Sequence, residues 1–143
     1  MFTRTSSPTR RLALVLAAAA TAAVMAGCAA TPPAAQVRIV EPADGATVPA
    51  TFKVRFGLQG MTVAPAGDIV AGTGHHHLLI NQTAIPPGEV VPVTPQHIHY
   101  GKGQTEAEVK LTPGTYKLTA QFANGAHQSY GSALSHTITV TVK

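Results

Sequence analysis

Cysteine, tryptophan and charged residues are scarce in this 143-residue chain. The single cysteine, Cys28, excludes an internal disulfide and any metal site built from several thiolates. Charged residues make up 11% of the sequence, aromatic residues 5%, and tryptophan is absent. Because hydrophobic residues still reach 45%, the chain is too apolar to be intrinsically disordered, and its length suits one folded domain.

Positive charge is concentrated at the N-terminus. The formal net charge is +4, but Arg4, Arg10 and Arg11 account for much of it. After Cys28, basic and acidic residues nearly balance and form no basic stripe. This distribution argues against a nucleic-acid partner.

Long apolar runs are also missing, apart from one at the N-terminus. The run 12–25 is too short for a bilayer-spanning helix and follows the basic residues, as in a secretion signal. It ends on Ala26-Gly27-Cys28, which resembles the bacterial lipobox. The pattern predicts a lipoprotein signal peptide over 1–27, a lipid on Cys28 and a Pro/Ala spacer over 28–35. The alternative is an ordinary signal peptide in which Cys28 is merely a small residue.

These features predict an exported protein, anchored in the cell envelope by the lipid on Cys28. We expect it on the periplasmic side of a membrane, with the outer membrane favoured.

From residue 36 to 143 the hydrophobic pattern has a period of two and no helical stripe. Phe52, Val54 and Phe56 alternate with polar residues, and 137–142 alternates equally clearly. The pattern predicts an all-β domain, a small antiparallel β-sandwich of immunoglobulin-like or fibronectin-like type with about seven strands. The segments 60–73 and 81–96 are rich in Pro and Gly and are predicted to be long loops or edge segments.

All seven histidines follow Gly74, and five of them form two tight groups. On an extended chain, residues two apart project to one face, so His75 pairs with His77 and His97 with His99. Imidazole is a good ligand for Cu(II) and Zn(II). The spacing therefore predicts one metal site, with copper favoured and zinc the second choice. Its predicted ligands are His75, His77, His97, His99 and, as a further ligand, His127.

Three other residues are candidates for supporting these ligands. Gln104 and Thr105 could hydrogen-bond the free ring nitrogen of His97 or His99, although satisfying the loop backbone is the simpler role. His76 is in phase with Leu78, so it is either a support for its neighbours or a packed core histidine.

Several segments resemble a known bacterial family. Gly74–Ile80 (GHHHLLI), His97–Glu106 (HIHYGKGQTE) and Phe56–Met61 are similar to the hallmark segments of the domain of unknown function numbered 4399. The resemblance covers nearly all of 36–143. It implies a small exported protein and supplies an expectation about the fold, but no reaction.

Together these features predict a non-catalytic lipoprotein of the cell envelope that uses a histidine-rich site for metal buffering or delivery. The alternative is an interaction module that binds an envelope protein or a cell-wall component without metal. We do not expect an enzyme, and we predict no catalytic residue. No serine or cysteine lies in the sequence context of a nucleophile elbow, and Glu106 and Glu108 have the pattern of a solvated strand face.

Overall fold

Within the residues that the structure describes, the fold is built from nine β-strands and one short 3₁₀ helix. The computed structural model describes residues 34–143. The predicted signal peptide, the predicted lipid site Cys28 and most of the spacer lie outside the described residues. The elements are β1 (Gln36–Glu41), β2 (Thr47–Val48), β3 (Thr51–Gln59), β4 (Thr62–Val63), β5 (Thr73–Ile80), β6 (His97–His99), β7 (Glu106–Lys110), β8 (Gly114–Ala123), η1 (Ser132–Leu134) and β9 (Ser135–Val142).

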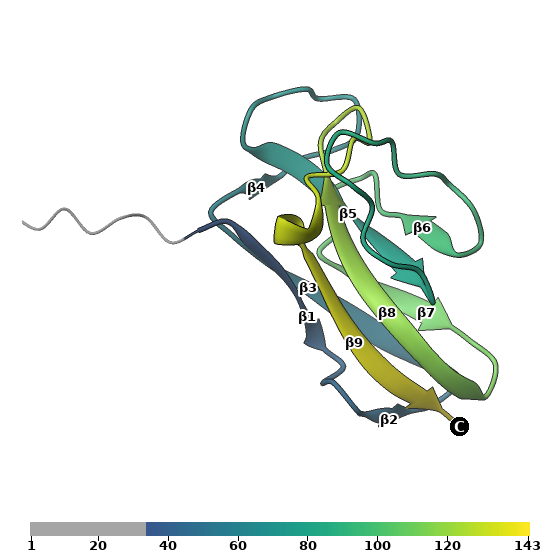
Figure 1. The fold of residues 1–143 in the computed structure, drawn as a ribbon. Coiled ribbons are helices and arrows are strands. Elements are labelled where there is room, and N and C mark those ends of the chain that lie inside the picture. Colours follow the sequence, from purple (N-terminus) through teal and green to yellow (C-terminus); the bar gives the residue numbers. More distant parts are fainter. Residues whose placement is uncertain (1–33) are drawn as a thin grey trace, which may run out of the picture. The chain divides into compact units, whose positions relative to one another are not determined.

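The strands form two sheets, and the prediction of an all-β sandwich is confirmed. One sheet has the order β1-β3-β7, and the other has the order β2-β9-β8-β5-β4, with β6 also paired to β5. Figure 1 shows β5, β8 and β9 side by side in one layer, with β1 and β3 in the other. Most pairs are antiparallel, as expected, but the two-residue strands β2 and β4 pair parallel to β9 and β5.

Alternation along the strands builds the core between the sheets. In β3, Phe52, Val54 and Phe56 are buried while the residues between them are exposed. In β9, Ile138, Val140 and Val142 point inward, as the sequence predicts. Burial of these side chains is the main force that holds the two sheets together.

A tyrosine fixes the entry to β8. The Tyr116 hydroxyl donates a hydrogen bond to the Thr112 carbonyl oxygen at 3.0 Å. A tyrosine that bonds the backbone a few residues upstream is typical of the corner before a late strand in immunoglobulin-like sandwiches.

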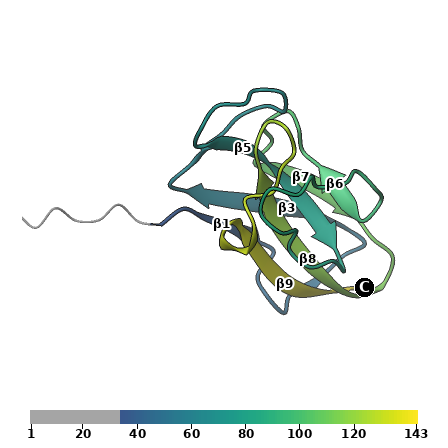
Figure 2. The same cartoon turned by 45° about the horizontal axis from the view of Figure 1, so that its top comes forward.

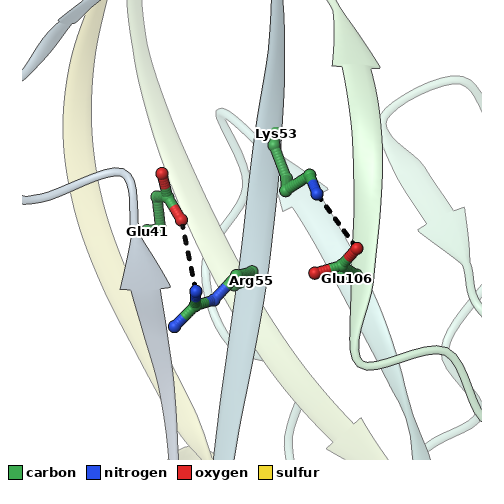
Figure 3. A network of polar contacts seen from close by, with 4 residues as sticks. All are labelled: Glu41, Lys53, Arg55 and Glu106. Carbon is green, nitrogen blue, oxygen red and sulfur yellow. Dashed lines mark hydrogen bonds and ion pairs between the residues drawn. The ribbon is translucent and has the colours of Figure 1, made fainter.

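The outer face of the three-stranded sheet is polar. Figure 3 shows its two ion pairs, Lys53–Glu106 at 3.0 Å and Arg55–Glu41 at 3.7 Å. All four side chains are at least half exposed, so each pair adds little to stability. Glu106 is therefore part of a solvated strand face, in line with its sequence pattern.

No helix within residues 34–143 is long and apolar enough to cross a membrane.

His136 joins the two sheets at their edge. Its Nδ1 accepts a hydrogen bond of 3.1 Å from the backbone N–H of Ile39, so β9 is tied to β1. We expect His136→Ala to lower the free energy of unfolding by about 1–2 kcal/mol, because a partly buried N–H loses its acceptor. Urea denaturation measures this loss. Thr115→Ala, an exposed position on β8, is the control. Equal stability of the two variants would contradict a structural role for His136.

Candidate metal centre

Strand β5 carries histidines on both of its faces. It lies between β8 on one side and β6 and β4 on the other, and every residue from Gly74 to Ile80 is buried. His76 faces the core between the sheets and stacks on Phe56, with ring centroids 4.7 Å apart. His75 and His77 project to the opposite face, because side chains alternate along a strand.

Four imidazoles meet on that outer face. The Nε2 atoms of His75 and His77 are 3.0 Å apart. His99 on β6 lies opposite His77 in the strand register, and its Nε2 is 3.2 Å from the Nε2 of His127. His75, His77 and His99 each offer a ring nitrogen within 4.8 Å of the others, and these three nearby histidines could hold a metal ion. We call His75, His77, His99 and His127 the histidine cluster.

His127 reaches the cluster from a tight turn. The Asn124 side-chain oxygen accepts hydrogen bonds from the backbone N–H groups of Ala126 and Gln128, at 2.9 and 3.0 Å. His127 itself adopts a left-handed conformation with φ of 64°. This conformation is unfavourable for a residue other than glycine, and such strained residues are common at functional sites.

Two loops cover the cluster. The backbone N–H of Ala66 donates to the Gly101 carbonyl oxygen, and that of Gly67 donates to the Gly125 carbonyl oxygen, both at 2.8 Å. Figures 1 and 2 show the segment 60–72 and the segment after β8 at the same end of the domain. The second covering loop is the segment 81–96, in which the Val91 N–H donates to the His127 carbonyl oxygen at 2.9 Å.

The loop over 81–96 also closes a second, smaller core on the outer face of β5. Leu79, Val91 and Ala123 are fully buried but are not part of the core between the sheets. Beside them lies Gln121, whose side chain accepts from the Ile85 N–H and donates to the carbonyl oxygens of Gly131 and Leu134. The cluster therefore rests on a packed, hydrogen-bonded base.

Gly101 leaves room for the His99 ring. A Cβ atom at this position would overlap the Cε1 and Nε2 atoms of the His99 ring. The absence of a side chain at residue 101 thus allows His99 to turn toward β5, a role of Gly101 that the sequence pattern does not indicate.

The environment of His75, His77 and His99 favours the neutral form of each ring. Burial, with the nearby positive charge that His99 and His127 would carry, lowers the pKa of His75 from 6.5 to about 4. Burial and the neighbouring histidines lower the pKa of His77 to about 3. Burial and His127 also lower the pKa of His99. Neutral imidazole is the form that binds a metal ion, so these three rings could bind one near pH 7 without first losing a proton.

The Nδ1 atoms of His75 and His77 are buried, and neither has a hydrogen-bond partner within the part of the chain that the structure describes. Two touching neutral imidazoles can share only one N–H between their Nε2 atoms. The cluster is therefore incompletely satisfied by its own hydrogen bonds, which is expensive for buried polar groups.

The other predicted site residues lie elsewhere. His97 does not join the cluster: its Nδ1 lies 2.9 Å from the Thr94 hydroxyl, and its register partner is Leu79. His76 is buried between Phe56 and Phe122 in the core between the sheets and does not support the cluster from behind. Gln104 accepts from the Lys102 N–H at 2.8 Å, so it stabilises its own loop.

Thr105 likewise serves the backbone. Its carbonyl oxygen accepts from the Phe56 N–H at 2.8 Å, and this bond joins the loop before β7 to β3. Among the hydrogen bonds of residues 34–143, none joins the side chain of Gln104 or Thr105 to a cluster histidine. Both residues thus take the simpler of the two roles considered from the sequence.

The sequence family is decided by the region from β3 to the end of the chain. The family described as Domain of unknown function (DUF4399) matches residues 54–143. The chain belongs to the DUF4399 family. The DUF4399 match includes β5, β6 and the 124–128 turn, and so contains the whole histidine cluster. No curated protein and no solved structure matches the chain. Since DUF4399 carries no assigned activity, inference about function rests on the geometry of the cluster.

Proposed function

We propose that this protein is a non-catalytic, metal-binding lipoprotein of the cell envelope. In this proposal the histidine cluster holds one copper ion, with zinc as the second choice, for metal buffering or delivery. The lipid on Cys28 anchors the exported domain to a membrane, with the outer membrane favoured.

The convergence of the Nε2 atoms carries the proposal. Nitrogens bound 2.0–2.1 Å from a tetrahedral zinc ion lie about 3.3 Å from one another. Neighbouring nitrogens around a square-planar Cu(II) ion at similar bond lengths lie about 2.8 Å apart. The observed separations of 3.0 and 3.2 Å fall between these values. The ring nitrogens of His75, His77 and His99 all lie within 4.8 Å of one another, so the rings would move closer together around either ion.

The chemistry of the ligands favours copper. An all-imidazole set suits Cu(II) and Zn(II), whereas Ca(II) and Mg(II) prefer oxygen ligands. At a given set of nitrogen ligands, Cu(II) binds more tightly than Zn(II). No hydrogen bond within residues 34–143 joins a carboxylate or hydroxyl group to the four clustered imidazoles, which supports a binding role over catalysis.

Metal analysis of the untagged protein tests this function. We expect one copper ion per chain after incubation with Cu(II) and gel filtration. At a hundredfold excess of free ion over the dissociation constant, bound metal should stabilise the fold by about 2.7 kcal/mol. His75→Ala combined with His77→Ala should abolish both effects, because it removes the two innermost nitrogens. His99→Ala serves the same purpose at a less buried position.

His97→Ala and His136→Ala are the matched controls, since neither ring belongs to the cluster. Both should keep the stoichiometry and the stabilisation. A wild-type protein that binds neither copper nor zinc would overturn the proposal and leave the metal-free interaction module as the better explanation. Loss of binding in His97→Ala would contradict the assigned ligand set.

A further inference from the structure

We propose that the cluster takes up and releases its ion through one face, with His127 as the exchangeable ligand and His75 and His77 as the permanent ones. This inference rests on the proposed metal-binding function. It states how the same site would pass its ion to another molecule.

The four histidines differ in how much of each ring is exposed to solvent. His75 and His77 are 0% exposed, whereas His99 and His127 are both partly exposed. An ion bound between them is reached from solvent past the two outer rings. Neither ring of the inner pair is itself exposed to solvent.

The backbone holds the inner pair far more firmly than it holds His127. His75 and His77 belong to β5 and pair with Ala123 and Gln121 on β8, while His77 also pairs with His99 on β6. Moving the inner pair away from the ion by opening β5 would break its backbone hydrogen bonds to both β8 and β6. Short turns at the surface open at much lower free energy than central strands do.

His127 lies on the side of the cluster away from His77. Its ring centroid is 4.7 Å from that of His99, 5.0 Å from that of His75 and 6.0 Å from that of His77. Its turn is fastened by the Asn124 side chain and by the Val91 N–H. The strained backbone conformation at His127 favours departure from the bound arrangement.

Transfer would then proceed by ligand substitution. A nitrogen or sulfur donor of the accepting molecule forms a bond to the ion as the bond from His127 Nε2 breaks. The imidazole leaves in its neutral form, no electron is transferred, and three histidines keep the ion until further donors replace them. An accepting protein with histidine, methionine or cysteine ligands has the required chemistry.

Release kinetics of the full chain loaded with Cu(II) test this order. Excess EDTA removes the ion, and the change in the copper absorption band is followed by stopped flow. We expect His127→Ala to retain one copper ion but to release it about ten- to a hundredfold faster. Paramagnetic resonance of the variant should show one coupled nitrogen fewer. His77→Ala should fail to retain copper.

Asn124→Ala provides a second test, because it loosens the turn without removing a ligand. It should release copper faster than wild type while keeping the nitrogen count, and His136→Ala should match wild type in both measurements. If wild type retains no copper, the proposed function and this inference fail together. If wild type retains it but His127→Ala loses it as completely as His77→Ala, or releases it at the wild-type rate, only this inference fails.

Discussion

Acidification from pH 7.5 to pH 4.5 is expected to unfold the metal-free protein. The folded pKa values of His75 and His76 are about 4 and that of His77 is about 3, chiefly because burial disfavours the charged ring. In the unfolded chain these residues titrate near 6.5. Between the two values the unfolded state binds protons that the folded state does not, so stability is fully present above pH 6.5 and falls below it.

The size of the effect follows from the number of buried rings. Each such histidine removes about 1.4 kcal/mol of stability per pH unit in this window. Three together remove about 4 kcal/mol per unit, so a domain with a typical stability of 5–15 kcal/mol should not stay folded far below pH 5. Urea denaturation at pH 7.5, 6.0 and 5.0 measures the slope.

His76→Leu is the informative variant for this slope. It keeps an apolar side chain between Phe56 and Phe122 but removes one titrating group, so the slope should fall by about a third. Stability that stays constant from pH 7.5 to 5.0 in wild type would show that the buried rings do not resist protonation.

Val54→Asp is expected to abolish folding. Val54 is 0% exposed and lies on β3 within the core between the two sheets. An unpaired carboxylate there costs several kcal/mol, which is a large part of the stability of a small domain. The β-sheet signal in far-ultraviolet circular dichroism and the cooperative thermal transition should both be lost.

Thr51→Asp is the matched control for Val54→Asp. Residue 51 is exposed on the same strand and lies opposite Lys110 in the register, so the new charge meets water and a cation. Its transition should stay within about 0.5 kcal/mol of wild type. A cooperative, near-native transition in Val54→Asp would show that this strand does not face the core.

Much of the fold was predictable because burial repeats every two residues. The alternation in β3 and β9 locates both strands and their inward faces, and the phase of His76 with Leu78 places that ring in the core. The parallel pairing of β2 and β4 was not predictable, because two-residue strands leave no periodic pattern.

The candidate site was only partly predictable, because its members depend on pairing between distant strands. Two-residue spacing makes His97 and His99 equivalent, but the register puts His99 opposite His77 and puts His97 opposite Leu79. His127 owes its position to the turn that Asn124 closes, and only the Asn124-Gly125 pair hints at that turn in the sequence. The close approach of His99 to Gly101 was not predictable, because it depends on how the chain folds back on itself after β6.

The ligands of the cluster come from β5, β6 and the 124–128 turn, which are far apart along the chain. An ion bound by all of them would therefore cross-link a stretch of about 50 residues, as a disulfide would. A chain with a single cysteine has no covalent means of doing this. The tie would be reversible and would depend on the supply of metal. The loop 81–96 lies between these ligands along the chain. Its resistance to cleavage by a protease would then report whether the protein is carrying its ion.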